Sequence, residues 1–177
     1  RYQWFEELKS ELKAHFITTA HHMNDQLETF LINLSRGTGL KGLTGIPAVN
    51  GSLIRPLLNL TREEITAYCC DNNVDYKDDS SNKVDKYLRN NLRHNVVPVL
   101  EEINPSMLQS FKRTLDHLNM VQERWEVEYV KWKEEVFSGN HATFSRNEIE
   151  KKSEKSFFSY LLKELSFSSS DIENLSL

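Results

Sequence analysis

Residues 15–39, HFITTAHHMNDQLETFLINLSRGTG, decide which class of fold the sequence predicts. The β-branched run at 15–20 is typical of a short buried strand. Residues 2–13 have helical periodicity, and a second helix is expected from Asp25 until the glycines at 37 and 39 end it. Helix, strand and helix in this order predict part of an α/β sheet that contains a parallel strand. The apolar side chains that indicate the second helix are Leu27, Phe30, Leu31 and Leu34.

The chain beyond this stretch predicts a hairpin and further helices. Residues 45–58 are typical of a β-hairpin, with Asn50-Gly51 in a type I′ turn. Thr61 and Glu64 form a capping box for a helix of about three turns. After a polar loop at 75–82, helical periodicity returns and is expected to break at Pro98 and again at Asn104-Pro105.

A long helix is expected from Ser106 to about Phe137. Its apolar side chains form one seam that is typical of a core or helix-pairing surface, with a cofactor box as the alternative. A turn with a short strand at 138–146 and a helix at 147–165 complete the predicted elements. The composition shift near Pro105 predicts two domains, 1–104 and 105–177. The seam consists of Leu118, Val121, Trp125, Tyr129, Trp132 and Val136.

Composition predicts a soluble, cytoplasmic protein. The 177 residues carry a formal charge of −4, which gives no global sign of a nucleic-acid-binding protein. The two cysteines, Cys69 and Cys70, are adjacent and match no zinc or redox spacing, so reduced thiols are expected. No apolar run approaches the roughly 20 residues of a membrane span. Because the chain starts at Arg1, already inside a predicted helix, we expect a fragment of a longer protein.

The segment from His21 to Glu28 has two interpretations. In the first, Asp25 is the N-cap of the helix and Glu28 its N3 partner, a structural role alone. In the second, His21 and His22 end a parallel strand where ligands bind, and both carboxylates face the same point. Histidines with two carboxylates suit a phosphate with Mg²⁺, or an ammonium group. Zinc is disfavoured because no third ligand is suitably spaced, and no G-x-S-x-G elbow supports a serine hydrolase.

Four segments favour the second interpretation by the order in which they occur: AHHMNDQLETFLINLSRGTGLKGLTGIP, IRPLL, DDSSN and YLRNNLRHNVVPVL. Together they resemble the tRNA(Ile)-lysidine synthetase family of the N-type ATP pyrophosphatase superfamily, over roughly residues 1–105. The resemblance implies an incomplete Rossmann-like α/β domain of the adenine-nucleotide α-hydrolase type, followed by a mostly helical second domain. Asn24 departs from the family pattern, in which an aspartate is common. The glycine-rich SGGxDS-type pyrophosphate loop is absent, so this chain by itself is expected to be inactive.

The resemblance also implies a reaction. The family attaches free L-lysine to C2 of the wobble cytidine in the isoleucine tRNA with a CAU anticodon. ATP first adenylates the cytidine and releases pyrophosphate, and the lysine amine then displaces AMP to give lysidine. The implied ligands are therefore ATP, Mg²⁺, free L-lysine and tRNA(Ile), with no membrane, and a homodimer is a further expectation.

Carried over residue by residue, the resemblance predicts three groups of site residues. The catalytic group is His21 and His22 near the nucleotide phosphates, with Asp25 as the Mg²⁺ or lysine contact and Glu28 beside it. A rim for ATP and substrate would contain Arg36, Gly37, Gly39, Gly42, Gly45 and Arg55. The tRNA-binding group would contain Arg89, Asn90, Arg93, Lys83, Lys86, Asp79 and Asn82.

Each group has a structural alternative. The glycine-rich loop of the rim could be a flexible connector, and Arg55 could pair with a carboxylate instead of a phosphate. The basic residues near 89 could form a solvated face, and Asp79 or Asn82 could cap the next helix. Two other functions are alternatives. One is a thiolation enzyme of the same superfamily, which is disfavoured because such enzymes often carry C-x-x-C pairs and this sequence has only the adjacent Cys69 and Cys70. The other is a non-catalytic tRNA-binding fragment.

Overall fold

The computed structural model describes residues 2–76 and 87–136 of the chain. The predicted elements at 138–146 and 147–165, and most of the predicted loop at 75–82, lie outside the described residues. Contacts divide the chain into two compact units, Arg1–Gln122 and Glu123–Leu177. The predicted domain boundary after residue 104 stays a prediction. In chain order the elements are α1 (Tyr2–Glu11), β1 (Ile17–Thr18), α2 (Met23–Ser35), α3 (Leu40–Leu43), β2 (Val49–Asn50), β3 (Leu53–Ile54), α4 (Arg62–Asp71), α5 (Tyr87–Asn91), a π-helical turn (Leu92–Val96), α6 (Val97–Ile103) and α7 (Met107–Val136).

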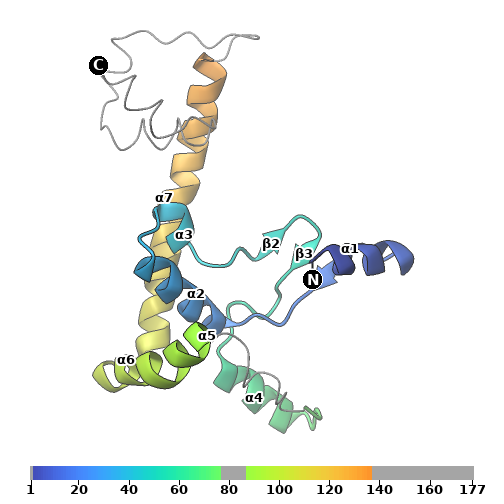
Figure 1. The fold of residues 1–177 in the computed structure, drawn as a ribbon, viewed down its shortest axis with the longest axis vertical. Coiled ribbons are helices and arrows are strands. Elements are labelled where there is room, and N and C mark those ends of the chain that lie inside the picture. The colour runs from blue at the N-terminus through green and yellow to red at the C-terminus, as the bar shows by residue number, and fades with distance from the viewer. Residues whose placement is uncertain (1, 77–86, 137–177) are drawn as a thin grey trace. The chain divides into compact units, whose positions relative to one another are not determined.

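Three two-residue strands form a small mixed sheet in the order β1-β3-β2 (Figure 1). β1 runs parallel to β3, with Ile17 opposite Leu53, and β2 runs antiparallel to β3. The predicted parallel strand and hairpin are therefore confirmed. The buried strand predicted at 15–20 was wrong in extent, because only two residues pair and Phe16 is 61% exposed. In the described part of the chain β1 has a neighbour on one side only, which leaves its surroundings partly open.

The hairpin turn differs from the predicted one by a single residue. Val49 pairs with Ile54 and Asn50 with Leu53, so Asn50 is a strand residue and the turn consists of Gly51-Ser52. Gly51 has φ +59°, while neither Asn50 nor Ser52 has a positive φ. Positive φ at the first central residue alone matches a type II′ turn, whereas type I′ requires it at both. The type I′ prediction was therefore wrong, although glycine does supply the conformation that the turn needs.

The start of α4 was predicted correctly. The Thr61 hydroxyl oxygen accepts from the Glu64 N–H at 3.1 Å, and the Glu64 carboxylate accepts from the Thr61 N–H at 2.7 Å. This second bond lowers the pKa of the Glu64 carboxyl below its ordinary value. The segment just before α4 also contacts the start of α2, because the Met23 N–H donates to the Leu60 carbonyl at 2.8 Å. The first turns of α2 and α4 are thereby brought together.

Pro98 does not break the helical run, contrary to the sequence prediction. The π-helical turn at Leu92–Val96 lies just before it, and Pro98 lies in the first turn of α6. Proline has no N–H to donate, and the helical hydrogen bonding changes from the α to the π type just before it, where the Val97 N–H donates to the Leu92 carbonyl. The second predicted break is confirmed, since Asn104, the residue before Pro105, has the extended backbone that a following proline favours.

The core of the first unit joins α2 to the first half of α7. It consists of Met23 and Leu27 from α2 with Phe111 and Leu115 from α7, and the Phe30 and Phe111 rings pack edge to face with centroids 5.2 Å apart. The long helix after Ser106 is confirmed. The predicted seam was wrong at Val121, which is 47% exposed, whereas the next residue, Gln122, is buried. Leu118, Trp125 and Tyr129 of the seam are partly buried, on the same helix as the buried Phe111 and Leu115. Spacings of three and four leave the register of such a seam open by one position.

No helix within the described residues is both long and apolar enough to cross a membrane.

Candidate active site

The first turn of α2 positions His22 and Asp25. His22 is the N-cap, with extended backbone, and Asp25 is N3. The Asp25 carboxylate accepts from the His22 backbone N–H at 3.0 Å, and its Oδ2 lies 3.6 Å from His22 Nε2. The predicted capping pair of Asp25 and Glu28 was therefore wrong by one turn: the helix starts earlier, and Asp25 is itself the acidic capping partner.

Glu28 follows one turn later and is almost completely buried, with 2% of its side chain exposed. Its Oε1 accepts from Arg93 Nε at 2.7 Å, while Arg93 Nη2 lies 4.0 Å from Asp25 Oδ1. This hydrogen bond to Glu28 raises the pKa of Arg93 above its ordinary value. One guanidinium from the π-helical turn thus bridges the two carboxylates of α2. Among the residues that the structure describes, the second oxygen of Glu28 has no hydrogen-bond partner.

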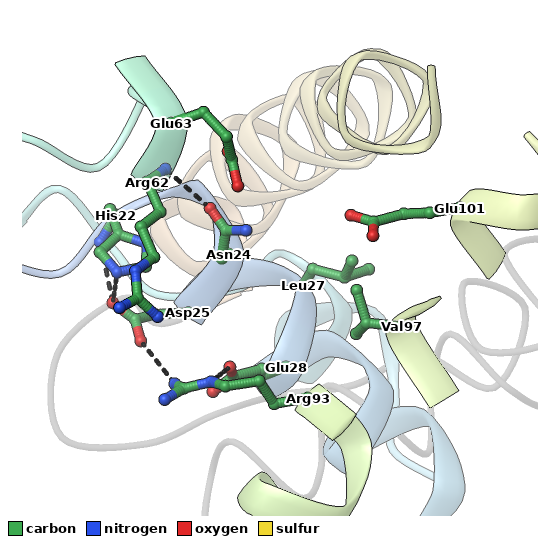
Figure 2. Close-up of a pocket in the computed structure, with 10 residues that line it drawn as sticks. All are labelled: His22, Asn24, Asp25, Leu27, Glu28, Arg62, Glu63, Arg93, Val97 and Glu101. Carbon is green, nitrogen blue, oxygen red and sulfur yellow. Dashed lines mark hydrogen bonds and ion pairs between the residues drawn. The ribbon is translucent and has the colours of Figure 1, made fainter. Parts of the chain in front are cut away.

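These side chains line a cavity of about 460 Å³. Figure 2 shows its walls, which come from the start of α2, the first turn of α4, the π-helical turn and α6. Four carboxylates and two guanidinium groups line it, so its formal charge is −2 with the histidine neutral. A cavity of this size and charge can hold a small cationic ligand. The lining residues are His22, Asn24, Asp25, Leu27, Glu28, Arg62, Glu63, Arg93, Val97 and Glu101.

The structure separates the two adjacent histidines. His22 lines the cavity, whereas His21 does not, and its Nδ1 is hydrogen-bonded to the Thr19 hydroxyl at 2.8 Å. The expectation that both imidazoles meet the carboxylates was therefore wrong for His21. The cause is local: in extended backbone, neighbouring side chains point to opposite sides. His22, Asp25 and Glu28 are the members of the predicted catalytic group that come together.

The predicted rim residues lie away from this cavity. Arg36 is the C-cap of α2, Gly37 follows it with φ +69°, and Gly39 is the N-cap of α3. The Gly42 carbonyl accepts from the Asn33 side chain at 2.8 Å, so this loop is attached to α2 and contains a helical turn. None of these residues lines the cavity, and their contact with a ligand stays a prediction.

Arg55 and Gly45 have structural partners. Arg55 is buried, and its Nη1 donates to the Pro47 carbonyl at 2.6 Å. Gly45 has φ +77°, and a Cβ there would overlap the Gln26 side chain. Neither residue lines the cavity. Within the described residues no ion pair of Arg55 with a carboxylate is found, and its contact with a phosphate stays a prediction.

The described members of the predicted tRNA-binding group face α2. Arg89 Nη2 donates to the Thr29 hydroxyl at 3.1 Å, and Arg93 binds Glu28 as described above. Asn90 lies between them on α5 and is partly buried. The other predicted members, at 79, 82, 83 and 86, lie outside the described residues. Binding of tRNA by these residues stays a prediction.

Sequence reasoning missed three charged residues of the cavity. Arg62 and Glu63 form the first turn of α4, and Glu101 lies on α6. The capping box at Thr61 marks where α4 starts, so a local signal existed for the element. No signal existed for its contact with α2, which depends on tertiary hydrogen bonds.

The described residues do not form a cage for a metal ion. No group of three or more histidine, cysteine or carboxylate side chains within 2–76 and 87–136 could hold one. Asp25 is surrounded by the His22 N–H, the His22 ring and Arg93. Mg²⁺ is commonly held by one or two carboxylates plus substrate phosphates. The predicted Mg²⁺ contact of Asp25 stays a prediction.

Comparison with known proteins identifies the class. Residues 1–100, more than half of the chain, match the PP-loop domain family. The chain belongs to this family, which has the adenine-nucleotide α-hydrolase fold, and the α/β class predicted from the sequence is confirmed at that level.

Curated relatives define the type of protein further. The tRNA(Ile)-lysidine synthase of Bacteroides thetaiotaomicron is 50% identical over 121 residues, which cover 68% of this chain and 28% of the relative. The enzymes of that name from Porphyromonas gingivalis W83 and Bacillus subtilis are 44% and 41% identical over 122 residues, covering 68% and 67% of this chain and 27% and 26% of theirs. The family resemblance is confirmed. The chain spans about a quarter of the length of these relatives.

Proposed function

We propose that this chain contributes the lysine-accepting part of a tRNA(Ile)-lysidine synthase site. In the proposed reaction, ATP adenylates the C2 oxygen of the wobble cytidine and pyrophosphate leaves. The lysine amine then attacks C2, its proton passes to a base, and AMP departs as the C–O bond breaks. The names of the relatives and the membership of the PP-loop family, which implies the use of ATP, support this proposal.

The observation that carries the proposal is the carboxylate pair on α2, in which Glu28 is buried and Asp25 is partly buried. Asp25 and Glu28 project into one cavity whose formal charge is negative, and within the described part of the chain Glu28 keeps one oxygen without a partner. A carboxylate in such a place is costly unless it binds a cation. Arg93 supplies part of that compensation now, and an incoming ammonium group would supply more. A carboxylate can also take the proton that the amine must lose before it becomes nucleophilic.

The remaining ligands follow from the same proposal. Mg²⁺ would neutralise charge on the ATP phosphates when bound, and in this proposal Asp25 would contact the ion while His22 would lie near the phosphates. The tRNA would be held by Arg89, Asn90, Arg93, Lys86 and Asn82, through phosphate contacts that lower affinity as salt rises. A homodimer is a further expectation from the resemblance.

The test replaces Asp25 by Asn in the complete protein that contains this chain. Asn keeps the size and can still accept from the His22 N–H, but it loses the charge and the basicity. We expect lysine transfer to tRNA(Ile) to fall by about 100-fold or more, with pyrophosphate release from ATP and tRNA retained. Glu7→Gln, at an exposed position on α1, is the matched control and should leave both steps unchanged.

The two half-reactions separate the alternatives. Loss of pyrophosphate release in Asp25→Asn would show that Asp25 acts in the adenylation step, with ATP, and not in the lysine step alone. Normal lysine transfer in a folded variant would leave the histidine–carboxylate group with a structural role. Sulfur incorporation by the wild-type protein would favour the thiolation enzyme, which the adjacent Cys69 and Cys70 and the names of the relatives argue against.

A further inference from the structure

Arg62 is a cavity residue to which neither the sequence analysis nor the proposed reaction assigns a role. It is the first residue of α4, it is exposed to solvent, and it lines the cavity. Figure 2 shows its side chain running from α4 towards Asp25 on α2. The guanidinium group therefore lies where a ligand that enters the cavity can reach it.

The backbone of Arg62 is attached to the first turn of α2. Its N–H donates to Asn24 Oδ1 at 3.0 Å, and two residues earlier the Leu60 carbonyl accepts from the Met23 N–H at 2.8 Å. A backbone N–H can only donate, so this attachment requires an acceptor oxygen at position 24 and nothing more. The aspartate that is common there in the family pattern would supply one as well. In both cases the Arg62 side chain starts from a fixed point on the cavity wall.

The charges of the cavity make a cation at this point informative. Four carboxylates and two guanidinium groups line the cavity, and one of these guanidinium groups, that of Arg93, is bound to Glu28 at 2.7 Å. The carboxylates can match the ammonium groups of a ligand without help from Arg62. They would repel an anionic group on the same ligand unless that group met a cation. Arg62 supplies such a cation at the wall formed by α4.

The shape of the guanidinium group indicates which anion it can bind. Its five N–H donors form a planar fork, which matches the two oxygens of a carboxylate through parallel hydrogen bonds. Five donors are more than one acceptor on the protein can use, so a ligand can share them. A phosphate also fits the fork, but a cavity with a formal charge of −2 suits the single charge of a carboxylate better than the several charges of a nucleotide. An α-amino acid carries that carboxylate beside an ammonium group, which the neighbouring carboxylates complement.

We propose that Arg62 is a specificity-determining residue that binds the α-carboxylate of the amino-acid substrate through its guanidinium fork. This inference rests on the proposed function, because it takes lysine as that substrate. It places the α-carbon end of lysine beside the first turn of α4, and the side chain of lysine carries its second amine onward to the pair formed by Asp25 and Glu28. The site then distinguishes lysine from amines of similar shape that lack the carboxylate charge.

The test is Arg62→Gln in the complete protein that contains this chain, with L-lysine and L-lysinamide as alternative amine substrates. Glutamine stays polar but loses the charge and the fork, and L-lysinamide has a neutral amide in place of the carboxylate. We expect the KM for lysine to rise by about 10- to 100-fold, with little change in kcat. The KM for L-lysinamide should change little, because that substrate has no carboxylate to lose a partner.

Two further variants complete the design. Arg62→Lys keeps the charge without the fork, so it should recover part of the affinity for lysine that Arg62→Gln loses. Arg124→Gln removes the same charge from α7, where 82% of the arginine side chain is exposed, and should change neither KM. Pyrophosphate release from ATP and tRNA should be retained in all three variants.

Several outcomes would overturn the inference. Equal increases in both KM values would show that Arg62 only positions α4, and an unchanged KM for lysine would show that it does not bind the amino acid. Loss of pyrophosphate release with an unchanged KM for lysine would assign Arg62 to the ATP phosphates. If Arg62→Gln does not fold, the wild type decides alone: a strong preference for L-lysine over L-lysinamide supports the inference, and equal use of the two excludes it. Failure of the proposed function is a separate result, because the wild-type protein would then transfer neither amine to tRNA.

Discussion

At the scale of single residues, Glu28 illustrates how a charge can be buried and yet stable. Removing a carboxylate from water is costly, and the cost is tolerable only when a cation and hydrogen bonds replace the lost water. Arg93 supplies both at 2.7 Å, although its own side chain stays 36% exposed. The pair joins residues 65 positions apart in the chain, and it connects the π-helical turn to α2 at the cavity wall.

A double-mutant cycle tests this dependence. Arg93→Met leaves the Glu28 charge buried without its partner, and we expect a loss of about 1 to 3 kcal/mol in the free energy of unfolding, less than for a fully buried pair because Arg93 is partly solvated. In the Glu28→Gln background most of this loss should disappear, since no buried charge remains. Urea unfolding of the wild type, the two single variants and the double variant at neutral pH gives the coupling free energy between Arg93 and Glu28.

The control for this cycle is an exposed pair of the same chemistry. Arg124 and Glu128 lie one turn apart on α7, with 82% of the arginine side chain exposed. Arg124→Met should change the free energy of unfolding by less than about 0.5 kcal/mol. Equal losses from Arg93→Met with and without the Glu28 charge would show that the arginine stabilises the fold by packing alone.

At the scale of elements, α2 holds the loop that follows it through two polar side chains. The buried Gln26 side chain donates to the Ile46 carbonyl at 3.0 Å and also accepts from the Ile46 N–H. Asn33, two residues before the end of α2, donates to the Gly42 carbonyl. These bonds explain why the glycine-rich segment is an ordered connection in the structure instead of a flexible one.

Two glycines of this loop form a matched pair for testing the Gln26 contact. Gly37 and Gly45 both have positive φ, so replacing either with Ala should cost about 1 to 2 kcal/mol of backbone strain. A Cβ at Gly37 would meet no atom within 4 Å, whereas one at Gly45 would overlap the Gln26 side chain and crowd Leu115. Gly45→Ala should therefore destabilise the protein by about 1 kcal/mol more than Gly37→Ala does.

Thermal unfolding, with amide exchange at Ile46, measures this difference. Gly45→Ala should lower Tm more than Gly37→Ala and speed exchange of the Ile46 N–H, which Gln26 protects. Similar Tm values and unchanged exchange for the two variants would mean that the loop adjusts without disturbing α2.

At the scale of the whole molecule, local signals proved more predictable than contacts between elements. The capping box at Thr61, the helix after residue 22 and the long helix after Ser106 each follow from a spacing within one segment, and all three form. The fold class also followed from the order of such segments. Errors arose where the exact position of an element along the sequence decided the structure, as at the hairpin turn. A pattern shifted by one residue fits the sequence nearly as well, so its position could not be fixed.

The candidate site was predictable only in part for the same reason. His22, Asp25 and Glu28 are neighbours in sequence, so their convergence could be expected from helical spacing. Arg62 and Glu101 reach the cavity through the contact between α2 and α4 and through the π-helical turn, neither of which has a sequence signal of its own. Arg93 was expected to face RNA, but its partner Glu28 could be identified only from the tertiary structure.

The core that supports the cavity yields the last prediction. Leu27 both lines the cavity and packs in the cluster with Phe111, so the start of α7 supports the site without touching it. Phe111→Ala should lower the free energy of unfolding by about 3 to 5 kcal/mol, because the side chain is 4% exposed. Met120→Ala, on the same helix at 65% exposed, should cost less than about 0.5 kcal/mol. Urea unfolding followed through the tryptophans gives both values. Equally small losses of unfolding free energy in both variants would mean that α7 is not part of the core that holds α2 in place.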